Sequence, residues 1–320
     1  MEPKRAFVLS GGSIRGAFQA GALAEILTSG TFVPDAIYGT SVGSLNGAFL
    51  ADRSGRAVIA GQAPDWVELG NKLQDFWLGE ITSFDKIARK RGGVSLLFDV
   101  VFENFDGFID TEPLRDLVRR EVQLENLKAS PLDFFACSVN VATGKAVYAS
   151  IDEYDNMHDY IIASTAIPLV MPVQMIGGDA YVDGGIREVA PLRQAIVDGA
   201  TEIYCILCQP EVLLRSQFNR KNAVELMERE VTIVTNETVN NDLELCQKIN
   251  ALLREHPELA DSGPLQGKRP IDLRIIRPDK PIELELETFD SEQILAAMKD
   301  GWKKAQEVRL SPTPLAEMAI

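Results

Sequence analysis

Apolar residues follow two spacings through the first two thirds of the chain, one typical of strands and one typical of helices. The first predicted helix, residues 16–27 (GAFQAGALAEIL), carries Phe18, Ala22 and Ile26 on one face, and residues 41–52 predict a second helix. Strands that alternate with helices indicate an α/β fold with a mostly parallel central sheet. The predicted strands are residues 5–10, 36–40, 133–139, 145–150, 173–177, 180–184 and 202–207.

The pattern changes after Pro210. Residues 217–255 are nearly all helix formers with apolar positions at helical spacing, and residues 272–278 (DLRIIRP) predict one strand. Residues 291–306 predict an amphipathic helix that begins at a serine cap. No linker rich in proline or glycine precedes this part, so we expect residues 211–320 to pack on a core formed by residues 1–210. A separate domain is the alternative.

The composition and the net charge indicate which class of protein and which partners to expect. The 320 residues are 46% hydrophobic and 25% charged, as in ordinary soluble proteins, and no apolar run reaches the ~18 residues of a membrane span. The net charge of −15 disfavours nucleic acid and anionic bilayers as general partners, so any membrane contact is expected to be local. We interpret the first residues as a strand and not a signal peptide, which predicts a cytoplasmic protein, peripheral at most to a membrane.

The four cysteines predict neither a disulfide framework nor a metal site. Cys205 and Cys208 form a C-x-x-C, but the run around them predicts a strand, in which residues three apart point to opposite faces. We expect them to be small buried apolar residues.

A glycine-rich stretch, residues 9–16 (LSGGSIRG), lies between the first strand and the first helix. Such a turn exposes backbone N–H groups at a helix N-terminus, where a phosphate or an oxyanion binds. A dinucleotide site would need a third glycine where Ser13 stands, and a P-loop would need a Gly-Lys-Ser/Thr sequence that is missing. A plain turn between strand and helix is the alternative.

A second stretch, residues 39–43 (GTSVG), also follows a strand and precedes a helix. The spacing of Gly39, Ser41 and Gly43 is G-x-S-x-G, in which the turn exposes the serine hydroxyl and the glycines avoid clashes. In the α/β-hydrolase fold the serine follows several strands and needs a histidine late in the chain. Ser41 comes early, and both histidines, His158 and His256, fall in helical contexts that suggest exposed or capping roles.

A third stretch, residues 180–191 (AYVDGGIREVAP), puts Asp183 before two glycines at the end of a predicted strand. Asp-Gly-Gly is most often a turn. Beside the other two stretches, Asp183 is a candidate base that replaces the missing histidine.

These stretches, together with residues 163–173 (ASTAIPLVMPV), occur in the order and rough spacing of the patatin-like phospholipase family, which the chain resembles over residues 5 to 210. The resemblance implies a three-layer α/β/α fold and hydrolysis of lipid acyl esters by a Ser–Asp dyad, without metal or cofactor. It implies Ser41 as nucleophile and Asp183 as base. The backbone of Gly11, Gly12 and Ser13 resembles the oxyanion hole, with Arg15 just behind it.

Some alternatives remain at this point. The family usually has glycine where this chain has Ser13, and a positive φ there would cost about a kcal/mol or more. An acyltransferase or thioesterase would use the same dyad, and a catalytically silent lipid-binding protein could keep the fold. Head group, chain length, regulation and oligomeric state are not predicted.

One surface feature is also predicted. Four basic residues within six positions (Lys86, Arg89, Lys90 and Arg91) precede the apolar run 94–108. This pattern suits a lip that contacts lipid head groups. A solvated helix face beside a core segment is the alternative.

Overall fold

The computed structural model describes residues 3–91, 107–214 and 223–311. Within them, eight strands form one sheet in the order β10-β9-β1-β2-β5-β8-β7, with β6 also paired to β5. The strands are β1 (Lys4–Leu9), β2 (Ala36–Thr40), β5 (Asp133–Asn140), β6 (Lys145–Ala149), β7 (Gln174–Ile176), β8 (Asp179–Asp183), β9 (Ala200–Ile206) and β10 (Asp272–Ile276).

The centre of the sheet is parallel. β10, β9, β1, β2 and β5 run in one direction, whereas β6, β7 and β8 are antiparallel to their neighbours. The predicted α/β class is therefore confirmed. In a sheet of this kind, ligands bind where the carboxyl ends of the parallel strands meet.

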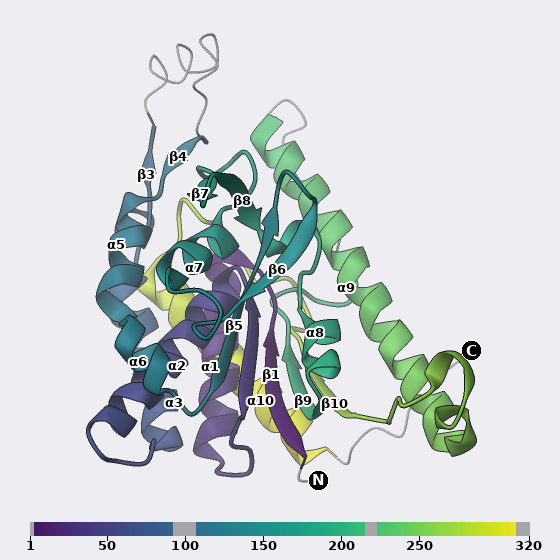
Figure 1. Cartoon of the computed structure of the whole chain (residues 1–320). Helices are drawn as coiled ribbons and strands as arrows, with labels where there is room; N and C mark the ends of the chain where they lie inside the picture. Colours follow the sequence, from purple (N-terminus) through teal and green to yellow (C-terminus); the bar gives the residue numbers. More distant parts are fainter. Residues whose placement is uncertain (1–2, 92–106, 215–222, 312–320) are drawn as a thin grey trace.

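Helices cover both faces of the sheet (Figure 1). Phe7 and Ile37 face a core that includes α1, α2, α3 and α10, whereas Ala6 and Tyr38, on the same strands, face α8 and α9. This alternation follows from the period of two along a strand. The helices are α1 (Gly16–Thr28), α2 (Val42–Ile59), α3 (Trp66–Glu80), α5 (Glu112–Glu121), α6 (Leu124–Ala129), α7 (Met157–Thr165), α8 (Leu192–Val197), α9 (Ala223–Glu255) and α10 (Ser291–Leu310).

Helix α1 is buried all round, from Gly16 to Leu27, and not on one face as its sequence predicted. The reason is α10, which crosses it closely at two glycines. A Cβ added to Gly21 would lie 1.9 Å from the carbonyl oxygen of Met298, and one on Gly301 would lie 1.9 Å from that of Phe18.

The part after Pro210 contributes to the same sheet and core. β10 pairs with β9 in parallel, and the Arg309 guanidinium at the end of α10 donates to the buried carboxylate of Glu25, at 2.6 Å in its shortest contact. The predicted cap of this helix is wrong by one residue. Asp290 accepts from the Gln293 N–H at 2.9 Å and forms a capping box, and Ser291 is the first helical residue.

Candidate active site

Ser41 stands between β2 and α2 in a backbone conformation that serine rarely adopts, with φ 55° and ψ −124°. The flanking glycines make this turn sterically accessible. A Cβ on Gly39 would lie 2.5 Å from the carbonyl of Gly43, and one on Gly43 would lie 2.4 Å from the carbonyl oxygen of Leu9. The geometry explains the G-x-S-x-G spacing, because any side chain at either position would collide with backbone.

A buried pair of serines holds this turn from behind. The Ser164 hydroxyl, on α7, accepts from the Ser41 N–H at 2.9 Å and donates to the carbonyl of Cys137 at 2.5 Å. Its oxygen lies 2.7 Å from the Ser44 oxygen, which also lies 2.7 Å from the Gly39 carbonyl, so the single Ser44 proton is directed either to Ser164 or to Gly39. Neither hydroxyl-bearing residue, Ser44 or Ser164, is exposed to solvent. The backbone of Ser41 is therefore fixed by groups that water cannot replace.

Asp183 reaches Ser41 through the register of the sheet. Thr40, the last residue of β2, is opposite Cys137 of β5, and the next residue of β5, Ser138, is opposite Asp183 at the end of β8. The strand pairing thus places Asp183 level with Ser41, although 142 positions separate them in the sequence. The Ser41 side chain lies near enough to the Asp183 carboxylate to lower its pKa.

The environment of Asp183 favours its neutral form. Burial raises its pKa from 3.8 to about 6, although the Ser41 side chain and a hydrogen bond from the Gly185 N–H act in the opposite direction. The Gly185 N–H donates to Oδ1 at 2.7 Å. A carboxylate with this pKa can accept a proton near neutral pH, where an ordinary aspartate is a very weak base.

The glycine-rich loop lies against Ser41. A Cβ on Gly11 would lie 3.3 Å from the Ser41 Cβ, and one on Gly12 would lie 2.2 Å from the Cys208 Cβ. The Gly11 N–H donates to the Val189 carbonyl at 2.8 Å, so it is not free to bind an oxyanion as the sequence suggested. Within the described ranges, the N–H groups of Gly12 and Ser13 have no acceptor.

Ser13 has the positive φ that was in question, 52°. A non-glycine residue there costs about 1–3 kcal/mol. The short helical turn that it opens, η1 (Ser13–Arg15), leads directly into α1 and places Arg15 at the base of that helix. The departure from glycine therefore leaves the loop conformation in place and adds strain to it.

Comparison with known proteins identifies the family. The family model for patatin-like phospholipases matches residues 7–196, which is more than half of the chain. The chain belongs to the patatin-like phospholipase family. Its fold is the patatin fold, and the class of reaction of the family is lipid hydrolysis.

Two further comparisons do not identify a function. The crystal structure of VipD from Legionella pneumophila is similar with a TM-score of 0.40 and 12% identity, over 96% of this chain and 67% of that one. No curated protein matches the chain. In the described part of this patatin-like chain, no helix is long and apolar enough to cross a membrane.

The two histidines of this family member have structural contacts. His158 donates from Nε2 to the Val122 carbonyl at 2.6 Å, and His256 caps a short helical turn after α9, where Nδ1 lies 3.1 Å from Glu258. Among the described residues, neither histidine hydrogen-bonds to Ser41 or Asp183. The cysteines Cys205 and Cys208 are buried and belong to cores on opposite faces of the sheet, as expected.

The predicted basic lip is described only in part. Arg89 and Lys90 form β3 (Arg89–Lys90), which pairs with β4 (Ile109–Asp110), and Lys90 contacts Glu287 at 2.6 Å. Most of the apolar run that follows, residues 94–106, lies outside the described residues.

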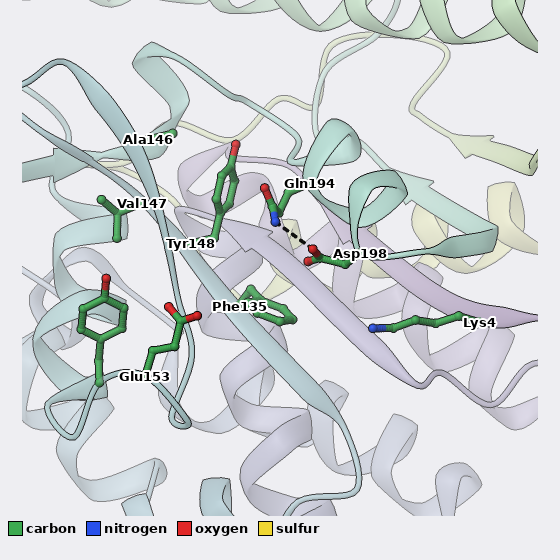
Figure 2. A pocket seen from close by; sticks show the side chains of 9 residues that line it. Lys4, Phe135, Ala146, Val147, Tyr148, Glu153, Gln194 and Asp198 are labelled. Carbon is green, nitrogen blue, oxygen red and sulfur yellow. Dashed lines mark hydrogen bonds between the residues drawn. The ribbon is translucent and has the colours of Figure 1, made fainter. Parts of the chain in front are cut away.

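A cavity of about 450 Å³ lies elsewhere, over Phe135 and between β6 and α8. Figure 2 shows the amide of Gln194 directed at the carboxylate of Asp198, with Tyr148 beside them and Lys4 across the opening. Ser41 and Asp183 do not line it. Gln194 pairs with Asp198, Lys4 with Asp133 and Tyr148 with Glu188, and we assign no ligand to this cavity.

The residues that hold the glycine-rich loop and the Ser41 turn in place were not predicted from the sequence. Gln19 is fully buried on α1 and donates to the carbonyls of Ser10 at 2.8 Å and Ile206 at 3.1 Å, which ties the glycine-rich loop to β9. A glutamine among the otherwise small and apolar residues 16–24 was the available signal. Ser44 and Ser164 gave none beyond lying in the motifs themselves.

Proposed function

We propose that the protein hydrolyses fatty acyl esters of lipids, as a phospholipase A-type esterase, through Ser41 as nucleophile and Asp183 as general base. The observation that supports this most strongly is the strand register, which brings Ser41, on its strained turn, level with a buried Asp183 whose pKa is raised to about 6. Family membership supports the substrate class, and the geometry supports the proposed roles of the two residues.

The chemistry follows from this pair. Asp183 takes the hydroxyl proton as Ser41 attacks the ester carbonyl, and the N–H groups of Gly12 and Ser13 bind the oxyanion that develops. Removing one such donor typically costs about 2.7–4 kcal/mol of barrier. Collapse of the tetrahedral intermediate expels the alcohol, to which protonated Asp183 returns its proton, and leaves an acyl-Ser41. Asp183 then deprotonates the water that attacks this ester and releases the fatty acid.

Burial serves the mechanism as well. Ser41 is 5% exposed and Asp183 is 6% exposed, so few waters compete for the carboxylate. A desolvated carboxylate is a better base, and the raised pKa of Asp183 is the sign of this effect.

The same acyl-Ser41 could pass its acyl group to another acceptor. An acyltransferase or thioesterase differs from the hydrolase only in the acceptor or the leaving group. Product analysis with and without an added alcohol or lysolipid separates them, because transfer gives a new ester whose yield follows the acceptor concentration.

The test of the proposal is covalent labelling. A fluorophosphonate probe should modify the parent once, at Ser41, and the rate should fall to background in Ser41→Ala. Ser291→Ala, at an exposed position on α10, is the control and should label like the parent. A parent that neither labels nor hydrolyses a phospholipid or a short p-nitrophenyl ester would be a silent lipid-binding protein, and the proposed function would be wrong.

A further inference from the structure

Exposed aliphatic side chains lie near the end of the sheet at which β2 leads into the candidate active site. Leu169 is 56% exposed, Ile186 is 49% exposed and Val212 is 70% exposed. We call these three residues, together with Met175 (58% exposed) and Leu214 (51% exposed), the aliphatic rim. Scattered apolar residues need no explanation, but a group around one site does.

Three connecting segments carry Leu169, Ile186 and the pair Val212 and Leu214, whereas Met175 lies on β7. Leu169 follows Ala166 by three residues, and the Ala166 carbonyl accepts from the Asp183 N–H at 2.9 Å. Ile186 follows Asp183 by three residues. On the other side, Val212 follows Cys208, whose side chain is against Gly12. The rim therefore borders the dyad from both sides.

Leu169 is also one of three non-glycine residues with positive φ among the described residues, at 66°, and the other two are Ser13 and Ser41. Leucine in this conformation is strained, and its exposure means that burial in the core does not compensate the strain. A strained residue that presents an apolar side chain to solvent is a candidate for contact with something outside the molecule.

Basic residues lie beside the rim. Arg187 is exposed and follows Ile186 directly. Arg89 and Lys90 are exposed on β3, whose partner β4 is connected to the Leu169 loop, because the Ile109 N–H donates to the Val170 carbonyl at 3.1 Å. In a chain with a net charge of −15, these cations stand next to aliphatic side chains at one end of the molecule.

We propose that this end of the molecule docks on the surface of a phospholipid bilayer, with the aliphatic rim inserted between the head groups and Arg89 and Arg187 against the phosphates. The inference rests on the proposed function, since it names the surface from which the ester reaches Ser41. Figure 1 shows β7, β8, β3 and β4 at the end of the molecule opposite the N-terminus.

The combination of exposed aliphatic and basic side chains favours a bilayer over a protein partner. Aliphatic residues flanked by basic ones are the pattern of proteins that bind the interface of anionic membranes.

The experiment compares two triple variants of the full chain. The rim variant carries Leu169→Asn, Met175→Gln and Val212→Asn. Asparagine tolerates positive φ better than leucine, so the fold should persist. Ile186 is left unchanged because it is close to Asp183. The control variant carries Val33→Asn, Ile59→Asn and Val197→Asn, which replace aliphatic side chains exposed by 40%, 57% and 63% near the opposite edge of the sheet.

Binding is measured by sedimentation with vesicles of phosphatidylcholine and phosphatidylglycerol, and activity with a short soluble p-nitrophenyl ester. The parent should bind, the rim variant should bind at least about tenfold more weakly, and the control variant should bind like the parent. All three should hydrolyse the soluble ester at similar rates.

Several outcomes would overturn the docking surface: a parent that does not bind vesicles, a rim variant that binds as well as the parent, or an equal loss in both variants. If the rim variant instead turns a dimer into a monomer on size exclusion and leaves vesicle binding intact, the rim is covered by a second copy. A parent that binds vesicles but hydrolyses no ester refutes the proposed function and leaves the docking surface standing.

Discussion

At the scale of single residues, the proposed role of Asp183 sets two requirements. As the proposed base, its carboxylate has to be basic enough to take the Ser41 proton and ionised enough to do so at the working pH. Burial raises the pKa, and the Ser41 side chain and the hydrogen bond from Gly185 limit the rise, which leaves it at about 6. Activity is therefore expected to depend on the ionisation of one buried group.

The pH profile should show this group directly. Because the base must be ionised, kcat/KM on a short p-nitrophenyl ester should rise about tenfold per pH unit below pH 6 and level off near pH 7. The measurement is a series of initial rates from pH 4 to pH 8, with the folded state checked by circular dichroism. A flat profile across this range would exclude a base with the pKa of Asp183.

Substitution of the base should remove activity that substitution of both histidines spares. Asp183→Asn keeps the size of the side chain but removes the proton acceptor, so kcat/KM should fall by at least about 10²–10⁴. The double variant His158→Gln, His256→Gln should stay within a few-fold of the parent, since both side chains contact only structural partners. An inactive histidine variant beside an active Asp183→Asn would indicate a histidine-based triad.

Ser164 should act on the reaction through the position of Ser41. Ser164→Ala leaves the buried Ser41 N–H without its acceptor, which should cost about 1–3 kcal/mol of stability and lower kcat with little change in KM. Ser164→Thr, which keeps the hydroxyl, should recover part of kcat. The control is Ser138→Ala, because the Ser138 hydroxyl is buried without a partner among the described residues and its loss should be neutral. An unchanged kcat in Ser164→Ala would limit Ser164 to a structural role.

The part of the site that lies in short sequence motifs could be predicted. Each of Gly39, Ser41 and Asp183 stands at the end of a strand, and the sequence around each marks that position. The partner of the Gly11 N–H could not be predicted, because the acceptor, Val189, is 178 positions away and contributes only its carbonyl. A backbone acceptor leaves no signature in residue type.

At the scale of elements, the strands were well predicted and the environment of α1 was not. Strand position follows from short apolar runs, and the sheet contains a strand at every run named in the sequence. The burial of α1 on all sides depends on α10, which starts 263 positions after the end of α1. An amphipathic pattern cannot reveal a second partner when small residues, here Gly21 and Gly301, form the contact.

The close crossing of α1 and α10 can be tested by substitution of its two glycines, with a third glycine as control. Gly21→Ala or Gly301→Ala would place a methyl group 1.9 Å from a backbone oxygen, so either change should destabilise the protein by about 1–3 kcal/mol or more. Gly79→Ala, in α3 with no atom within 4 Å of the added Cβ, should stabilise by about 0.5–1 kcal/mol. Denaturant unfolding of the three variants measures both effects. Tolerance of alanine at Gly21 would mean that α10 does not cross α1 this closely.

At the scale of the whole molecule, the site imposes a cost on folding. The ends of β2 and β8 bring Ser41 and Asp183 together where both are buried, and the proposed base, Asp183, has to ionise there. A group whose pKa is raised in the folded state destabilises that state once the pH passes the pKa of the unfolded chain. Functional residues of this kind are a common source of stability–activity trade-off.

The final prediction concerns the stability of the whole chain against pH. Below pH 3.8, Asp183 is protonated in the folded and the unfolded state, so it contributes no pH dependence. As the pH rises from 3.8 to about 6, the unfolded state ionises first, and the folded state loses on the order of 2–3 kcal/mol relative to it. The Asp183→Asn variant should not lose this stability, because its side chain does not ionise.

The melting temperature of Asp183→Asn should therefore equal that of the parent near pH 4 and exceed it by several degrees above pH 7, in a protein that has lost its esterase activity. Asp75→Asn, at an exposed position of α3, controls for the removal of one negative charge and should show no such divergence. Differential scanning calorimetry at pH 4, 6 and 8 provides the measurement. If Asp183→Asn were less stable than the parent at pH 8, the ionised carboxylate would be stabilising the fold, and its role as a desolvated base would have to be abandoned.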